Sequence, residues 1–152
     1  MSHGGLGTPP AMATSSASRP PDLDAEIQRW SLEDPGQLQA LRRSLLERIE
    51  TRAGTDDALA DVPEKMLIVA TELATNALRH GLPPTIVRLC RTGRDYIIEV
   101  IDHDPTTEPG TPAGQTPAAG GLGLVVARAL ALDVGWYVTA TDKHVWARFP
   151  FP

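Results

Sequence analysis

A carboxylate, an amide and an imidazole recur at every fourth residue within one short stretch of the sequence. Glu72, Asn76 and His80 lie in the run ATELATNALRHG of residues 70–81. In a helix this spacing places the three side chains on one face, and four residues rise only about 6 Å, the scale of a nucleotide's phosphate tail. The carboxylate can accept a proton, and an amide oxygen suits a hard cation such as Mg²⁺. A solvated helix face has the same pattern, so the rest of the chain must decide.

Two later features could complete a nucleotide site. Asp102 ends an apolar, β-branched run, and a buried carboxylate can accept a hydrogen bond from the exocyclic amine of adenine. Gly121 and Gly123 precede an apolar helical pattern, where glycines and helix amides allow close approach of phosphates. Each feature alone also has a structural explanation, as a strand-ending aspartate or a tight turn. The glycines form neither a dinucleotide fingerprint nor a P-loop, because G-x-G-x-x-G and G-K-[ST] are both absent.

Caps and periodicity predict the elements that would position these residues. A strand is expected over residues 26–32. A first helix should begin at Asp34 with a capping box and end near Gly54, and a second should run from Asp61, capped with Glu64, to Gly81. This second helix carries the polar stripe.

After the prolines at 83–84 the spacing of apolar residues changes from a helical pattern to one typical of strands. One hairpin is expected from residues 85–90 and 96–101, and another from residues 134–140 and 144–149. Between them lies a loop over residues 103–119, of a length typical of disorder or an active-site lid, and then a helix over 125–132. The predicted order is strand, helix, helix, strand, strand, loop, helix, strand, strand.

Composition limits the class of protein. The 152 residues are 41% hydrophobic, which fits one globular domain over residues 23–152 after a disordered leader of residues 1–22 rich in small residues and proline. The net charge of −5 argues against nucleic acid or an anionic membrane as the main partner. A single cysteine, Cys90, excludes an internal disulfide, and with neither a signal sequence nor a membrane span in the pattern we expect a cytoplasmic location.

In their order along the chain, the segments at 71–81, 101–102 and 121–124 resemble the N box and two glycine boxes of the GHKL ATPases, the histidine kinase-like superfamily. Within that superfamily the chain looks most like the small stand-alone anti-sigma factor serine kinases and their ATP-binding relatives. The resemblance covers about residues 26–149 and includes the closing hairpin at 143–146. The N box is its most specific part.

The resemblance implies an α+β fold of the Bergerat type, a two-layer α/β sandwich with helices on one face of a mixed, mostly antiparallel sheet. It also implies ATP with Mg²⁺ as cofactors, bound between the N-box helix and a lid. Glu72 would be the catalytic base that activates the attacking hydroxyl, and Asn76 would hold Mg²⁺. The cofactor-binding residues it implies are Asn76, Asp102 for adenine, Gly121, Leu122, Gly123 and Leu124 for the phosphates, and Arg79 as a candidate phosphate or partner contact. His80 is expected to cap the helix end.

Two departures leave the activity open. The family's first glycine box reads approximately D-x-G-x-G, whereas residues 102–106 read DHDPT, and residues 103–119 contain no Arg or Lys. One interpretation is a kinase that transfers the γ-phosphoryl group of ATP to a serine of an anti-anti-sigma (STAS-type) partner. The alternative is a catalytically weak, nucleotide-dependent binding module that sequesters a sigma factor or another regulator. Pairing through an edge strand would allow a homodimer in either case.

Overall fold

The computed structural model describes residues 18–49, 60–106 and 122–151. The elements are, in order, β1 (Ala25–Leu32), a 3₁₀ turn η2 (Pro35–Gln37), α1 (Leu38–Arg48), α2 (Val62–His80), β2 (Thr85–Thr92), β3 (Asp95–Asp102), α4 (Leu122–Leu130), β4 (Asp133–Val138) and β5 (Lys143–Pro150). The predicted order of strands and helices is therefore confirmed. The helix expected over 125–132 begins earlier, at Leu122, so Gly123 lies inside its first turn.

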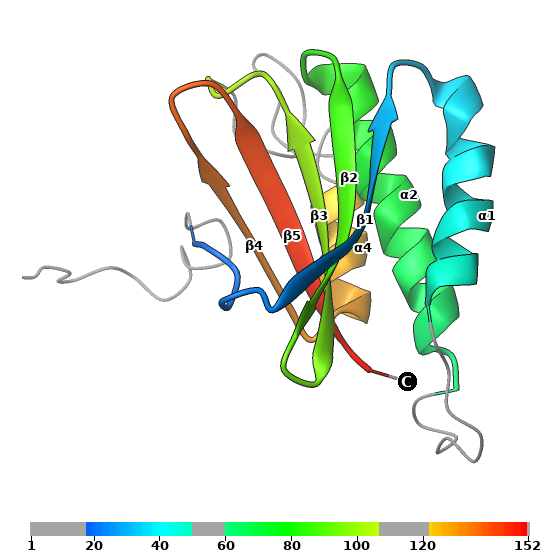
Figure 1. The fold of residues 1–152 in the computed structure, drawn as a ribbon. Coiled ribbons are helices and arrows are strands. Elements are labelled where there is room, and N and C mark those ends of the chain that lie inside the picture. The colour runs from blue at the N-terminus through cyan, green and yellow to red at the C-terminus, as the bar shows by residue number, and fades with distance from the viewer. Residues whose placement is uncertain (1–17, 50–59, 107–121, 152) are drawn as a thin grey trace, which may run out of the picture.

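The strands form one five-stranded sheet in the order β1-β2-β3-β5-β4. All four pairings are antiparallel, whereas the prediction allowed a mixed sheet. The α-helices α1, α2 and α4 cover one face of the sheet (Figure 1). The predicted two-layer α+β fold is confirmed, and β3, which ends at Asp102, is the central strand.

The main core lies between the helices and the sheet. Alternate residues of β2, β3 and β5 point to the helices because side chains alternate between the two faces of a strand. These buried residues are Val87, Leu89, Ile98, Val100, Val145, Ala147 and Phe149, and they form one cluster with Met66, Val69, Leu73 and Ala77 of α2. The apolar side of α2 is therefore fixed against the sheet, which fixes the direction of its polar stripe as well.

The two predicted capping boxes have different outcomes. At the first, Asp34 Oδ1 accepts the amide of Gly36 at 2.7 Å and Gln37 Oε1 accepts the amide of Asp34 at 3.2 Å, as expected. At the second, Asp61 makes no side-chain cap bond. Its backbone has φ −98° and ψ 5° instead of an extended conformation, so the carboxylate does not reach the first amides and lies 3.5 Å from Lys65 Nζ instead. The capping box with Glu64 was wrong.

The amino-terminal part of the described chain contacts the face of the sheet opposite the helices. Ser18 donates its amide to the carbonyl of Trp136 at 2.6 Å and accepts the indole N–H of Trp146 at 2.8 Å. The guanidinium of Arg19 lies 4.3 Å from the ring centre of Tyr137. The predicted disordered leader lies outside the described residues up to position 17, and from Ser18 the chain is bound to the sheet. No described helix is both long enough and apolar enough to cross a membrane.

Candidate functional site

Asp102 is buried at the end of the central strand, with 3% of its surface exposed. Its Oδ1 accepts the amide of Asp104 at 2.8 Å, and its Oδ2 lies 3.6 Å from Lys143 Nζ. Burial raises the pKa of this carboxyl, and although the amide of Asp104 and the charge of Lys143 act in the opposite direction, the net shift is upward. The side chain is thus largely removed from water, and Oδ1 acts as an acceptor for a backbone amide.

Gly81 allows Asp102 to pack directly on the end of α2. The helix ends where the Gly81 amide bonds the carbonyl of Ala77 at 2.8 Å. A Cβ added at Gly81 would lie 2.6 Å from Asp102 Oδ2 and 2.8 Å from the Ala77 carbonyl oxygen. The φ of Gly81 is −95°, so the glycine is needed for this close approach and not for a left-handed turn. The sequence predicted that Gly81 stops the helix, but not that it makes room for Asp102.

The first turn of α4 lies against the polar stripe of α2. A Cβ added at Gly123 would lie 3.4 Å from the carbonyl oxygen of Glu72 and 3.6 Å from Asn76 Cβ. Because the first four amides of an α-helix have no acceptor within the helix, the start of α4 presents N–H donors beside Asn76. Three segments that are distant in sequence are therefore adjacent: the N-box helix, the end of β3 and the start of α4.

The other predicted site residues lie at or near this junction. Glu72 and Asn76 are partly buried on α2, and Arg79 is exposed and His80 half-buried in its last turn. Leu124 is buried in the main core, so only its backbone is available to a ligand. Gly121 and the side chain of Leu122 lie outside the described residues, as do residues 107–119 of the predicted lid.

The segment that replaces the first glycine box is held by side-chain bonds. His103 donates its amide to Leu82 at 3.0 Å, its Nδ1 lies 2.9 Å from the carbonyl oxygen of Pro84, and its Nε2 lies 3.6 Å from Asp142 Oδ1. The Asp104 carboxylate accepts the amide of Thr106 at 3.0 Å. His103, at a variable position of that box, thus ties the end of β3 to the loop after α2 and to the β4–β5 hairpin, whereas Asp104 and Thr106, at the missing glycines, bond to each other.

Sequence reasoning missed two polar residues beside Asp102. The β2–β3 register pairs Ile86 with Ile101, so Thr85 lies next to Asp102, and β5 pairs Lys143 directly with Asp102. Thr85 and Lys143 are 1% and 4% exposed. The Thr85 hydroxyl has no hydrogen-bond partner within the described chain. The sequence did carry a signal for them, because side chains two residues apart on a strand lie on the same face. Thr85 and Lys143 each stand two residues before a core position of their own strand.

Asn76 offers one oxygen ligand of the kind that Mg²⁺ prefers. Within residues 18–49, 60–106 and 122–151, no group of three or more His, Cys, Asp or Glu side chains is arranged to hold a metal. Mg²⁺ commonly takes one or two protein ligands together with phosphate oxygens and water. The amide oxygen of Asn76, beside the amides at the start of α4, fits that mode of binding.

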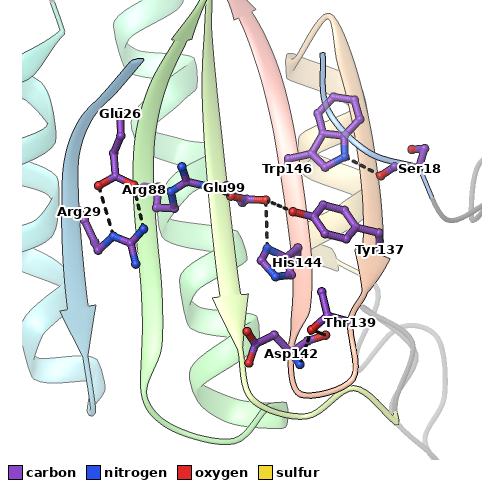
Figure 2. A network of polar contacts seen from close by, with 10 residues as sticks. All are labelled: Ser18, Glu26, Arg29, Arg88, Glu99, Tyr137, Thr139, Asp142, His144 and Trp146. Atoms are coloured by element: carbon purple, nitrogen blue, oxygen red, sulfur yellow. Dashed lines mark hydrogen bonds and ion pairs between the residues drawn. The ribbon is translucent and has the colours of Figure 1, made fainter. Parts of the chain in front are cut away.

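A second polar cluster occupies the face of the sheet opposite the helices, and Figure 2 shows its centre at Glu99. This buried carboxylate accepts hydrogen bonds from Arg88 Nη1 and, at 3.0 Å, from the hydroxyl of Tyr137, and His144 Nδ1 lies 3.1 Å from it. Burial by itself raises the pKa of Glu99, but the bond and charge of His144, the charge of Arg88 and the bond from Tyr137 outweigh burial and lower it. The cluster satisfies its own charges and connects β2, β3, β4 and β5.

A five-stranded antiparallel sheet covered by helices on one face is the α+β architecture of a GHKL-type ATPase domain. In agreement, the family model of the histidine kinase-like ATPase domain matches residues 32–149, and the chain belongs to that family. Domains of this family bind ATP, usually with Mg²⁺. A search of curated proteins finds no match to the chain.

Proposed function

We propose that this protein binds ATP with Mg²⁺ along α2 and transfers the γ-phosphoryl group to a serine of a STAS-type partner in bacterial regulation. The observation that carries the proposal is the junction of three segments. Gly81 brings Asp102 onto the end of α2, and Gly123 brings the start of α4 onto Asn76. Base recognition and phosphate binding thereby become parts of one site.

The order of these contacts along α2 supports the direction of the nucleotide. Gly81 with Asp102 lies at the carboxyl end, Asn76 with Gly123 lies in the middle, and Glu72 lies one turn further on. From Glu72 to Gly81 the helix rises about 14 Å. A base held at Asp102 and phosphates held at the start of α4 would direct the γ-phosphate toward Glu72.

The proposed reaction needs only the groups already named. Glu72 accepts the proton of the partner's serine hydroxyl as the hydroxyl oxygen attacks the γ-phosphorus. The bond from that phosphorus to the bridging oxygen breaks, and ADP leaves with the electron pair. Asn76 would hold Mg²⁺ together with the phosphates, and the ion would supply positive charge opposite the developing negative charge. The amides at the start of α4 would bind the phosphates.

Kinase activity is tested by Glu72→Gln. Removing a general base lowers transfer by roughly 100-fold or more, whereas the affinity for ATP should change little because Glu72 does not contact the base or hold the metal. Transfer is measured with radiolabelled ATP and a STAS-type protein, together with that protein's serine-to-alanine variant. Glu64→Gln is the matched control, since Glu64 is an exposed carboxylate in the first turn of the same helix. Unchanged transfer in Glu72→Gln would show that the assigned base is wrong.

The second candidate is a nucleotide-dependent binding module that sequesters a sigma factor or another regulator with little turnover. The observation that favours it is the bonded turn from Asp104 to Thr106, the two positions where the family has glycines. Binding of the partner is measured with and without ATP, in wild type and in Glu72→Gln. Equal partner affinity in the presence and absence of ATP would remove this candidate.

Adenine recognition is tested separately with Asp102→Asn. The carboxylate is an acceptor only, whereas an amide also presents donors. Wild type should bind ATP and discriminate against GTP in a calorimetric titration with Mg²⁺, and the variant should lose that discrimination. The absence of ATP binding by folded wild type would overturn the proposed function as a whole.

Location and assembly complete the proposal. We propose that the protein acts in the cytoplasm, and that it forms a homodimer through β1 or β4, the two edge strands of the sheet. Analytical ultracentrifugation over a range of concentrations tests the second point. Sedimentation as a monomer at the highest concentration would contradict it.

A further inference from the structure

Lys143 is a buried cation at the base end of the proposed site. Its ammonium Nζ lies 3.6 Å from Asp102 Oδ2, and the side chain is 5% exposed. Buried lysines are rare because desolvation of the charge is costly, and they are found paired. Lys143 lies at the end of its strand, opposite Asp102, and its burial there needs a chemical explanation.

The pair with Asp102 leaves donor capacity on Lys143. An ammonium carries three N–H donors and no acceptor, and 3.6 Å exceeds the usual length of a hydrogen bond. Asp102 uses Oδ1 for the amide of Asp104, so Oδ2 is the oxygen that faces Lys143. The hydroxyl of Thr85, beside Asp102 on the neighbouring strand, has no partner within the described chain. One group of this buried row therefore lacks a partner, and Lys143 has donors beyond its contact with Asp102.

The row presents an acceptor and a donor side by side, and adenine presents the complement. The exocyclic N6 amine of adenine is a donor, and the adjacent ring nitrogen N1 is an acceptor. Guanine reverses both positions, with the O6 acceptor and the N1–H donor. An acceptor from Asp102 and a donor from Lys143 would each face a group of like polarity on guanine, and such mismatches leave buried groups unpaired.

We propose that Lys143 is a specificity-determining residue of the ATP site, whose ammonium donates a hydrogen bond to N1 of adenine while the N6 amine donates to Asp102. The proposal rests on the proposed function and deepens it. Lys143 then has two roles, since its charge opposes the effect of burial on the Asp102 carboxyl and its ammonium bonds the neighbouring atom of the base.

The test compares ATP with 1-deaza-ATP, in which a C–H group replaces N1, by calorimetric titration with Mg²⁺. A hydrogen bond to a charged group corresponds to a factor of roughly 10 to 100 in affinity. Wild type should bind 1-deaza-ATP more weakly than ATP by that factor. Lys143→Met should bind ATP more weakly than wild type and should bind the two nucleotides equally. Lys65→Met is the matched control, because Lys65 is the other lysine of the sequence and lies on the outside of α2.

The outcomes separate this proposal from the proposed function. Wild type that binds ATP and 1-deaza-ATP equally would overturn the role of Lys143 and leave the ATP site intact. Wild type that binds neither nucleotide would overturn the site itself. The wild-type comparison does not depend on the folding of any variant, and a folded Lys143→Met that still discriminates against 1-deaza-ATP would also refute the proposal.

Discussion

Replacing Gly81 by alanine should destabilise the fold and weaken ATP binding at the proposed adenine end of the site. The new methyl group would lie 2.6 Å from Asp102 Oδ2 and 2.8 Å from the carbonyl oxygen of Ala77. The second of these atoms is backbone and the first belongs to a short, buried side chain, so neither can move without cost. Asp102 must be displaced, and its bond from the amide of Asp104 is lost with its position.

The size of the effect follows from three contributions. Overpacking costs about 1–3 kcal/mol, and loss of a hydrogen bond to a charged group costs about 1.5–3 kcal/mol. Alanine also restricts the unfolded chain more than glycine does, which stabilises the folded state by about 0.4–1 kcal/mol. Gly81→Ala should therefore lower the free energy of unfolding by about 1.5–5.5 kcal/mol, which corresponds to a fall in Tm of roughly 3–20 °C for a domain of this size.

Urea denaturation and thermal melting measure the stability, and calorimetric titration measures the affinity for ATP. Gly123→Ala is the matched control for the stability measurement alone, because Gly123 belongs to the proposed phosphate site. Its methyl group would make ordinary contacts, 3.4 Å from the carbonyl oxygen of Glu72, and alanine is preferred over glycine within a helix by about 0.5–1 kcal/mol. This variant should be as stable as wild type or slightly more so. The reasoning is refuted if Gly81→Ala retains both the stability and the ATP affinity of wild type.

Two further predictions concern the other face of the sheet. The pKa of Glu99 is lowered on folding, so its contribution to stability is present above the unfolded value of about 4.3 and is lost as the pH falls through the lower folded value. Glu99→Gln should lower the free energy of unfolding by about 3 kcal/mol at pH 7. The variant should also lose less of this free energy than wild type as the pH falls below about 4.3. Urea denaturation across pH measures both effects, and an equally steep loss in the variant would contradict the prediction. Cys90 is fully buried, and burial raises the pKa of its thiol to about 11, so a disulfide reagent at pH 8 should label it only after unfolding in urea. Rapid labelling of native protein would show that the inner part of β2 opens.

Local patterns in the sequence were enough for the element order. The helix that carries the polar stripe, the capping box at Asp34 and the hairpin around Gly93 depend on neighbours within a few residues, and each was predicted correctly. The cap at Asp61 failed because the chain enters α2 with a backbone conformation that the residue types alone do not specify. The start of α4 was misplaced for a similar reason, since Gly123 weakens a helical pattern that packing on α2 restores.

The Glu99 cluster illustrates a second limit. The sequence places a glutamate in the apolar run of β3, but the identity of its partners depends on which strands flank β3. Arg88 comes from β2, Tyr137 from β4 and His144 from β5. No local pattern connects residues so far apart along the chain.

The sequence by itself determined the class of the domain, the helix that carries Glu72 and Asn76, and the candidate roles of Asp102 and the glycines. Only the tertiary structure decided that Gly81 must be small so that Asp102 can reach the end of α2, and that Thr85, Asp102 and Lys143 lie in one buried row. The physical reason is that strand register and helix docking are set by burial of the whole core. Side-chain periodicity tells which face a residue occupies, whereas register tells which residue lies beside it.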